Sequence, residues 1–281
     1  MRVVVTGAEG QLGREIVSLL HAAEYEVFPS DIAHLDIGDN KTIMDAIAHL
    51  SPGLIINCAA YTDVDGCEKN RSLADRVNRD GPANLARAAA AAAAIIVHYS
   101  TDFVFDGTNG KPYTETDAPH PLSAYGLSKL AGDQAVQTIA PDHLIIRTSW
   151  VYGHGPKNFV LSIARQLHAG KKALRVVEEK GSPTYARDLA EATMALLGRS
   201  VRGLVNFCNS GECTRLEYAR EIARLLGADV EVTPISSEEL NLPARRPAYS
   251  TLDRSLYKRL TGQFPRPWQT ALEDYIKREL V

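Results

Sequence analysis

Three glycines, Gly7, Gly10 and Gly13, directly follow the apolar run Val3–Val5, and a helical pattern begins among them. Where a strand turns into a helix, the first such glycine permits the tight turn, the second lets a pyrophosphate approach the backbone, and the third lets helix and strand pack closely. The start of the helix offers free N–H groups and a positive dipole end to phosphates. The pattern predicts a dinucleotide-binding βαβ unit, with a plain strand-to-helix turn as the alternative.

Short apolar runs alternate with helical patterns through the first half of the chain. The expected strands are Val3–Val5, Val27–Phe28, Leu54–Ile56, Ile95–Val97 and Leu144–Ile146. The expected helices are Leu12–Ala22, Thr42–Leu50, Leu73–Ala93 and Leu127–Ala140. Strands buried on both faces have continuous apolar runs, and strand–helix–strand repeats form parallel sheets with right-handed crossovers. We therefore predict an α/β fold with a Rossmann-like, doubly wound parallel sheet.

After Trp150 the pattern changes to a smaller, interrupted lobe. Its expected helices are Phe159–His168, Asp188–Leu197, Leu216–Leu226 and Gln269–Leu280, and its expected strands are Leu174–Val177, Val205–Phe207 and Val230–Val232. We predict a dinucleotide-binding Rossmann domain over residues 1–150. Residues 151–281 are expected to form mainly a substrate-binding lobe, with room for segments that return to the Rossmann core. Ligands of open α/β sheets bind at the carboxyl ends of the strands, where this lobe should pack.

The composition argues against several other classes of protein. The chain has 281 residues and a net charge of −3, without the basic surplus of a nucleic-acid-binding protein. No apolar run reaches the ~18 residues of a membrane-spanning helix, and the segment MRVVVTG lacks a signal-peptide pattern. The four cysteines form neither a CxxC pair nor a zinc spacing. We expect a cytoplasmic protein with reduced thiols and no membrane or nucleic-acid partner.

Several residues are placed to bind the rest of a dinucleotide. Asp31 ends the second expected strand, where an acid can hydrogen-bond the adenosine ribose. The same carboxylate would repel a 2′-phosphate, which favours NADH over NADPH. The stretch Leu35–Ile37 can flank the adenine, and the small residues within Asn57–Thr62, Ala59 among them, let a ligand approach the backbone. A solvated loop acid and close helix–sheet packing are the alternative interpretations.

Tyr125 and Lys129 stand four residues apart, a spacing that places both on one face of a helix. A free tyrosine has a pKa of about 10, and a nearby ammonium lowers that pKa, which eases proton exchange. Ser100, Thr101 and Asp102 end a buried strand, where we expect the hydroxyls to face the crevice and Thr101 to hydrogen-bond a substrate oxygen. A nicotinamide hydride and a proton from Tyr125 would then reduce a ketone.

Seven segments carry a resemblance to a known family: TGAEGQLG, LIINCAAYTDVDGCE, HYSTDFVFDG, PLSAYGLSK, RTSWVYG, GSPTYARDLA and ARRPAYSTLD. Over essentially the whole chain they resemble extended short-chain dehydrogenases/reductases and, within these, the dTDP-4-dehydrorhamnose reductase family. The resemblance implies an oxidoreductase of dTDP-rhamnose biosynthesis. Such an enzyme reduces the C4 keto group of dTDP-4-dehydro-6-deoxy-L-mannose to dTDP-L-rhamnose with NADPH and often NADH, and Tyr125 would be its proton donor.

The resemblance also implies roles for single residues. The cofactor would contact Gly10, Gln11, Leu12, Asp31, Asp36, Ile37, Ala60, Tyr61 and Thr62, with Lys129 on the nicotinamide ribose. Thr101 and Asp102 would contact the sugar, and Trp150 would belong to the sugar or base pocket. Arg246 lies in an Arg-Arg-Pro run that suits bidentate contact with a diphosphate. The alternatives are a core tryptophan and a solvated basic loop.

One position departs from the family pattern. Some members are thought to dimerise around Mg²⁺ held by glutamates, and Glu15 matches the first of these positions, but the later one is Arg187. Mg²⁺ needs oxygen ligands, which a cationic side chain does not supply. We therefore doubt that Mg²⁺ binds, expect no metal site, and leave a monomer and a homodimer both open.

Two other functions remain as alternatives. A nucleotide-sugar epimerase or dehydratase holds NAD tightly, is usually longer, and more often has Ser-x-x-x-Val-Tyr-Gly at the strand end, where this chain has Ser-Thr-Asp-Phe-Val-Phe. A non-catalytic subunit similar to the regulatory subunit of methionine adenosyltransferase is the second. The presence of Thr101, Tyr125 and Lys129 argues against it.

Overall fold

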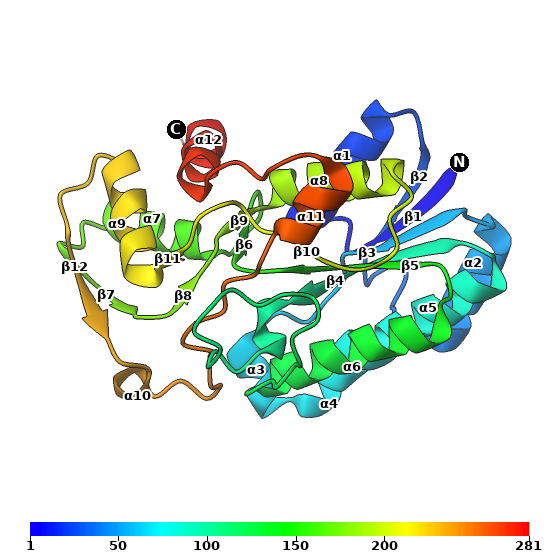
Figure 1. Cartoon of the computed structure of the whole chain (residues 1–281), viewed down its shortest axis with the longest axis horizontal. Helices are drawn as coiled ribbons and strands as arrows, with labels where there is room; N and C mark the ends of the chain where they lie inside the picture. The colour runs from blue at the N-terminus through cyan, green and yellow to red at the C-terminus, as the bar shows by residue number, and fades with distance from the viewer. Residues whose placement is uncertain (281) are drawn as a thin grey trace.

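The computed structural model describes residues 1–280. Its centre is a parallel six-stranded sheet with the strand order β10-β5-β4-β3-β1-β2 (Figure 1). The strands are β1 (Arg2–Thr6), β2 (Glu26–Ser30), β3 (Leu54–Asn57), β4 (Ile95–Thr101), β5 (His143–Thr148) and β10 (Gly203–Asn206). The predicted doubly wound α/β fold is confirmed. The strand order reverses between β3 and β1, and a ligand crevice is expected at such a point.

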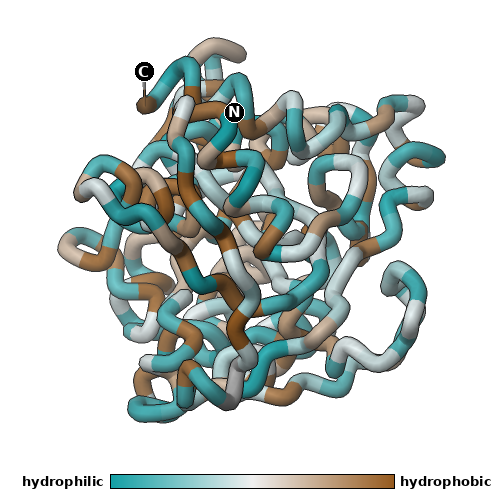
Figure 2. Tube along the Cα trace, turned by 90° about the vertical axis from the view of Figure 1, so that its left-hand side faces the viewer, coloured by the Kyte–Doolittle hydropathy of each residue, from teal (hydrophilic) through white to brown (hydrophobic). Residues whose placement is uncertain are grey.

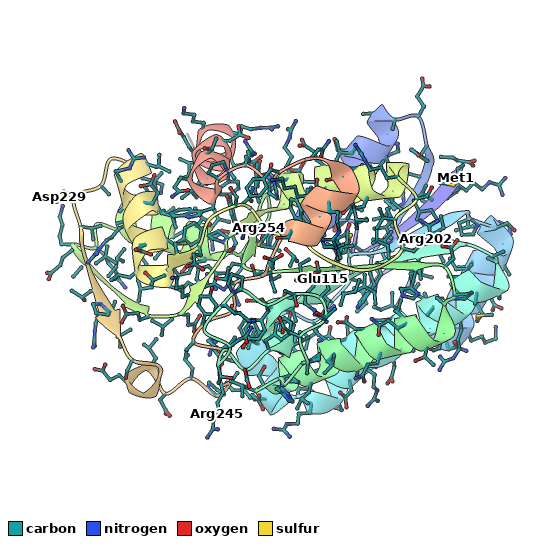
Figure 3. All side chains as sticks on the ribbon, viewed as in Figure 1. Met1, Glu115, Arg202, Asp229, Arg245 and Arg254 are labelled. Carbon is teal, nitrogen blue, oxygen red and sulfur yellow. The ribbon has the colours of Figure 1, made fainter. Side chains whose placement is uncertain are left out.

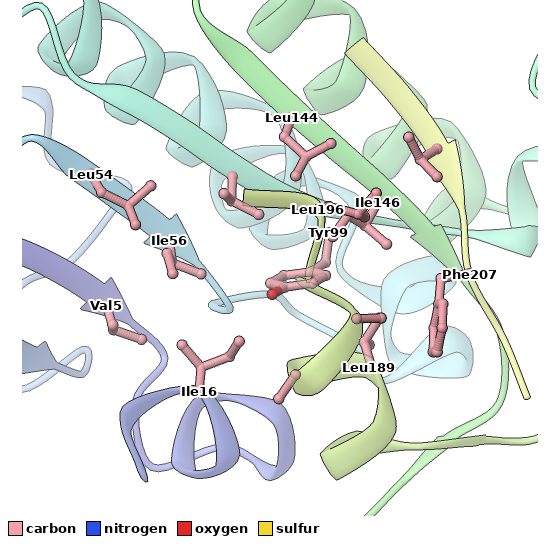
Figure 4. Packing of buried hydrophobic residues seen from close by; sticks show 14 of the residues in the cluster. Val5, Ile16, Leu54, Ile56, Tyr99, Leu144, Ile146, Leu189, Leu196 and Phe207 are labelled. Atoms are coloured by element: carbon pink, nitrogen blue, oxygen red, sulfur yellow. The ribbon is translucent and has the colours of Figure 1, made fainter. Parts of the chain in front are cut away.

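Helices cover both faces of this sheet (Figure 1). One face packs against α1 (Gln11–Ala22), α8 (Ala186–Gly198) and α11 (Ser255–Thr261), and the other against α2 (Asn40–Leu50), α5 (Gly81–Ala91) and α6 (Ala124–Ile139). Because side chains alternate along a strand, Val5 belongs to the first core and Val4 to the second. Figure 4 shows the first core, where Ile16 of α1 and Leu189 of α8 approach Tyr99 of β4.

Most predicted helices agree with the structure to within two residues at each end, and two differ by more. The segment expected to be one helix from residue 73 to 93 is α4 (Arg71–Asp75), the π-helix η1 (Arg76–Asp80) and α5, and the short helix α3 (Val64–Lys69) precedes it. The helix expected from Leu127 begins at Ala124, because the Ser123 hydroxyl accepts the N–H of Gly126 at 3.2 Å and caps it. Tyr125 therefore lies in the first turn of α6.

The smaller lobe has a core of its own, rich in tyrosine and tryptophan, which includes Tyr152, Tyr218 and Trp268. Its elements are β6 (Val151–Tyr152), α7 (Phe159–His168), β7 (Ala173–Val177), β8 (Lys180–Gly181), β9 (Thr184–Tyr185), β11 (Cys213–Thr214), α9 (Arg215–Leu225), β12 (Glu231–Ile235), α10 (Ser237–Leu240) and α12 (Trp268–Glu279). Three elements of the second half, β10, α8 and α11, pack instead in the large sheet domain.

Short hydrophobic and hydrophilic stretches both recur along the trace (Figure 2). Among the described residues, no helix has both the length and the apolar character to cross a membrane.

The 3₁₀ turn η2 (Asp102–Val104) follows β4 and leads toward the segment that carries Tyr125. The carboxyl ends of β1, β3, β4 and β5 are therefore followed by the residues predicted to bind cofactor and substrate.

Candidate active site

The turn between β1 and α1 has the shape that a phosphate-binding loop requires. Gly7 has a φ of +65°, and a Cβ there would lie 2.6 Å from the backbone nitrogen of Ala59. A Cβ on Gly13 would lie 2.1 Å from the carbonyl oxygen of Gly7. Gly10 caps α1 without a side-chain hydrogen bond, and it is exposed, so the first N–H groups of the helix, those of Gln11 and Leu12 included, face no capping side chain. The residues present fit a dinucleotide diphosphate.

Asp31 lies against this turn, because its carboxylate accepts the N–H of Glu9 at 2.7 Å. The second acid is engaged elsewhere: Asp36 accepts the N–H of Gly38 at 2.8 Å and pairs with Arg76. Ile37 is buried, with 4% of its surface exposed. Asp31 therefore contacts the glycine turn directly.

The segment after β3 is held by two asparagines. Asn57 accepts the N–H of Ala59 at 3.2 Å, and Asn78 of η1 both accepts the N–H of Tyr61 at 2.9 Å and donates to its carbonyl at 3.0 Å. The backbone from Ala59 to Tyr61, with Ala60 between them, is therefore fixed beside Gly7, and Thr62 is exposed beyond it. Sequence reasoning did not single out Asn78.

Tyr125, Lys129 and Thr101 are all buried at the junction of α6 and the end of β4. Burial raises the pKa of the Tyr125 phenol above its usual 10, while a hydrogen bond with Thr101 opposes the rise. Burial lowers the pKa of Lys129 to about 8, and its ammonium group donates to the carbonyl of Tyr99 at 2.6 Å. The expectation that Lys129 lowers the pKa of Tyr125 is wrong for this structure, because desolvation dominates and the ammonium group contacts a backbone carbonyl. The phenol is protonated at neutral pH.

The residues that end β4 do not all face the same way. Thr101 donates to Asp102 at 3.2 Å, and Ser250 donates to the other Asp102 oxygen at 2.5 Å. Burial raises the pKa of Asp102 to about 6. Ser100 instead donates to Asp133 of α6 and is 4% exposed. The expectation that the Ser100 hydroxyl faces the crevice is therefore wrong, since successive strand residues point to opposite faces of a sheet.

Trp150 has a φ of +47°, which is rare for a bulky residue and is associated with functional sites. Its ring supports the guanidinium group of Arg215, whose central carbon lies 3.6 Å from the ring centroid. The ring of Phe159 lies 4.8 Å from the same carbon. This cation–π stack joins the start of α9 to the end of β5. Nothing in the local sequence around Arg215 indicated that its side chain stacks on Trp150.

Arg246 is half-buried and paired. It donates to both carboxylate oxygens of Asp65, at 2.8 and 3.3 Å, and its Nε lies 3.7 Å from Glu179. Its neighbour Arg245 is exposed and lies at the edge of the molecule (Figure 3). The two arginines of the run therefore have different environments, and a diphosphate near Arg246 would meet a guanidinium group already bound by a carboxylate.

The described residues contain no group of three or more His, Cys, Asp or Glu side chains arranged to hold a metal ion. Burial raises the pKa of Glu15, and Arg187 opposes the rise. Arg187 itself pairs with Glu191 at 3.1 Å.

A family model described as "RmlD substrate binding domain" matches residues 1–281. The chain belongs to this family. A curated dTDP-4-dehydrorhamnose reductase from Streptomyces griseus is 41% identical over 281 residues, covering 97% of this chain and 92% of the relative. The crystal structure of a dTDP-4-dehydrorhamnose reductase from Clostridium acetobutylicum has 41% identity and a TM-score of 0.96, with both chains covered completely. The Bacillus anthracis dTDP-4-dehydrorhamnose reductase in complex with NADP has 37% identity and a TM-score of 0.94, with 99% of each chain covered. The predicted family, and with it an oxidoreductase, is confirmed.

Proposed function

We propose that this RmlD-family chain uses NADPH to reduce the C4 keto group of dTDP-4-dehydro-6-deoxy-L-mannose to dTDP-L-rhamnose. The observation that carries the proposal is the position of the Tyr125 phenol, which is buried with Thr101 at the carboxyl end of β4, where burial raises its pKa. The names of the relatives support the substrate, and the NADP in the Bacillus anthracis structure supports the cofactor. Asp31 leaves room for NADH as an alternative cofactor.

When bound, the dinucleotide supplies the hydride. The N-terminus of α1 binds its diphosphate through backbone N–H groups, and Asp31 accepts from an adenosine ribose hydroxyl. Lys129 donates to the nicotinamide ribose from its buried position on α6. Thr101 orients the sugar carbonyl, and Tyr125 holds the proton that the carbonyl oxygen takes up as negative charge develops on it.

The remaining residues shape the sugar nucleotide site. Asp102 is held by Ser250 and accepts from a sugar hydroxyl. The Trp150–Arg215 stack places a buried cation and an aromatic face at the end of β5, beside the smaller lobe. Arg246 and Arg215 both lie within 4 Å of the Glu179 carboxylate. A diphosphate bound here would be negatively charged like that carboxylate, and it would take over the contacts that Glu179 makes with the two guanidinium groups.

The deciding experiment is a spectrophotometric assay of NADPH and NADH oxidation with dTDP-4-dehydro-6-deoxy-L-mannose. Turnover with a product heavier by two hydrogen atoms supports the proposal, and no absorbance loss with either cofactor overturns it. Turnover of a sugar nucleotide by protein that carries NAD from purification, with no net cofactor oxidation, indicates the epimerase alternative instead.

A further inference from the structure

A row of buried polar side chains crosses the large sheet on the α6 face, close to the carboxyl ends of its strands. Three members are neighbours in register on β1, β3 and β4, and three more are neighbours on β4, β5 and β10. Each is at most 4% exposed: Thr6, Asn57 and His98, then Ser100, Arg147 and Asn206. Buried polar groups are costly unless they are paired, so a continuous row across five strands calls for a physical account.

Asp133 of α6 lies over the middle of this row and is 2% exposed. It stands four residues after Lys129, which itself stands four residues after Tyr125, so all three share one face of the helix. Ser100 donates to its carboxylate, the Nε2 of His98 lies 3.5 Å from one oxygen, and a terminal nitrogen of Arg147 lies 3.8 Å from the other.

The row also fixes which nitrogen of His98 carries a proton. The Asn57 carbonyl oxygen accepts the Thr6 hydroxyl at 2.8 Å and the Ala59 N–H at 3.2 Å, so the amide nitrogen must face His98. That nitrogen donates to His98 Nδ1 at 3.1 Å, which leaves the proton on Nε2, toward Asp133. Burial, followed by the charge of Lys129, lowers the pKa of His98 to about 4. His98 is therefore neutral and does not cancel the charge of Asp133.

The negative charge of Asp133 consequently stabilises the charged forms of two cations, Lys129 and Arg147. Arg147 stacks over Phe105 at 5.0 Å and has Glu115 as a second acid nearby. Glu115 lies near the centre of the molecule in Figure 3 and accepts the N–H of Asn206 at 2.8 Å. For Lys129, burial lowers the pKa to about 8, and among the described residues Asp133 is the charged group that opposes the fall.

We propose that Asp133 is a positioning residue that keeps Lys129 in its ammonium form, and that the Thr6–Asn57–His98 chain holds Asp133 and couples it to the phosphate-binding turn. Thr6 directly precedes Gly7, and Asn57 fixes the N–H of Ala59, which lies against Gly7. The turn that would bind the diphosphate is thus joined to Asp133 by buried hydrogen bonds from Thr6 to His98 and by the 3.5 Å approach of His98 to Asp133. Asp133 then acts on Lys129 through its charge. The effect of Asp133 on the titration of Lys129 does not depend on the proposed function. Only its effect on the kinetics rests on that function.

The titration of Lys129 tests the proposal without any assay of activity. In protein labelled with ¹³C-lysine, the Lys129 Cε signal is assigned by its loss in Lys129→Arg. We expect a midpoint near 8 in the parent protein and one lower by about one pH unit or more in Asp133→Asn, because an opposite charge at this range shifts a pKa by about 1–3 units. Asp133→Glu restores the charge and should recover most of the shift.

A matched control removes a buried carboxylate elsewhere. Asp188 of α8 is buried on the opposite face of the sheet, where it pairs with Arg266, so Asp188→Asn should leave the Lys129 midpoint unchanged.

If Asp133→Asn does not fold, Arg147→Met serves instead. It removes the other cation near Asp133, so the carboxylate stabilises the Lys129 ammonium group more strongly and the Lys129 midpoint should rise. An unmoved Lys129 midpoint in folded Asp133→Asn, or in Arg147→Met, overturns the proposal.

A kinetic readout separates positioning from a merely structural role. Without Asp133 both the Lys129 ammonium and the Tyr125 phenol lose their protons at lower pH, since Asp133 raises both pKa values. The other groups that raise the pKa of Tyr125, Asp102 and Cys67, are unchanged in these variants. The alkaline limb of kcat/KM should therefore move to lower pH in Asp133→Asn, with a loss near tenfold at pH 8.5 and little loss at pH 6.5.

A uniform loss at every pH would indicate a structural role and overturn the proposal. If the parent protein oxidises no NADPH with the sugar nucleotide, the proposed function fails, whereas the Lys129 titration still decides the role of Asp133.

Discussion

Asp65 accepts two hydrogen bonds from Arg246, at 2.8 and 3.3 Å, across a separation of 181 residues along the chain. The backbone N–H of Ala244 donates to the same carboxylate at 3.1 Å. The pair fastens the loop that precedes residue 250 onto α3, which follows β3. The side chain predicted to meet a diphosphate thus also joins the two parts of the molecule.

Replacement of Arg246 by Met should lower the free energy of unfolding by about 1–3 kcal/mol at pH 7, because a half-buried carboxylate loses its partner. Burial raises the pKa of Asp65, but the bonds from Arg246 and Ala244 outweigh it, and the pKa is lowered. That stability is present above the unfolded pKa of 3.8 and is lost as the pH falls through the lower folded value. Urea unfolding should therefore show a smaller difference from the parent at pH 3. The exposed Arg245→Met is the matched control, and equal losses in both variants would contradict the prediction.

Tyr125→Phe should reduce kcat by about 10²–10⁴-fold, since it removes the proton donor but leaves the ring in place. The edge-to-face contact with Phe103, at 5.6 Å between ring centres, should persist. NADPH affinity, measured by fluorescence titration, should change less than about threefold, a factor worth well under 1 kcal/mol. Near-normal turnover would show that the proton comes from another group.

Asp31→Ala should shift the preference of the enzyme toward NADPH. The carboxylate lies against the glycine turn, where it would repel a 2′-phosphate and accept from a free ribose hydroxyl. We expect the ratio of kcat/KM for NADPH to that for NADH to rise by about tenfold, which corresponds to about 1.4 kcal/mol. An unchanged ratio would mean that Asp31 does not reach the ribose.

Asp102→Asn should stabilise the protein at alkaline pH while it impairs turnover. Burial raises the pKa of Asp102 from 3.8 to about 6, so its contribution to stability is present below pH 3.8 and is lost as the pH rises through about 6. Two pKa units correspond to about 3 kcal/mol. Thermal unfolding should show that the free energy of unfolding of the variant, relative to that of the parent, increases by an amount of this order between pH 4 and pH 8. A constant difference over that range would contradict the pKa.

The features that could be predicted from the sequence are those written in contiguous residues. The glycine turn, the apolar strands and the Tyr125–Lys129 spacing each lie within a few residues, and the predicted sheet and helix order follow from them. The glycines that allow close packing, such as Gly13, stand out because few other residues are compatible with a Cβ position 2.1 Å from a carbonyl oxygen.

The contacts that sequence reasoning missed depend on strand register and on lobe packing. Single polar residues such as His98 and Arg147 interrupt apolar strands, and only the register of the sheet shows that they form one row beneath Asp133. Ser100 was placed on the wrong face for the same reason. The Arg215–Trp150 stack joins elements far apart in the chain, and no local pattern encodes such a pairing.

The edge strand of the large sheet is added late. Strand β5 ends at Thr148, but its neighbour β10 begins only at Gly203, after α7 and α8 have been added. During synthesis the nucleotide-binding half therefore waits for more of the chain, and meanwhile β5 presents unpaired backbone groups that can pair with other molecules. A chain released between these two points would lack β10 and would expose β5, a buried central strand of the finished sheet, as an edge strand. This interval is therefore the stage of synthesis at which the chain is most prone to aggregate.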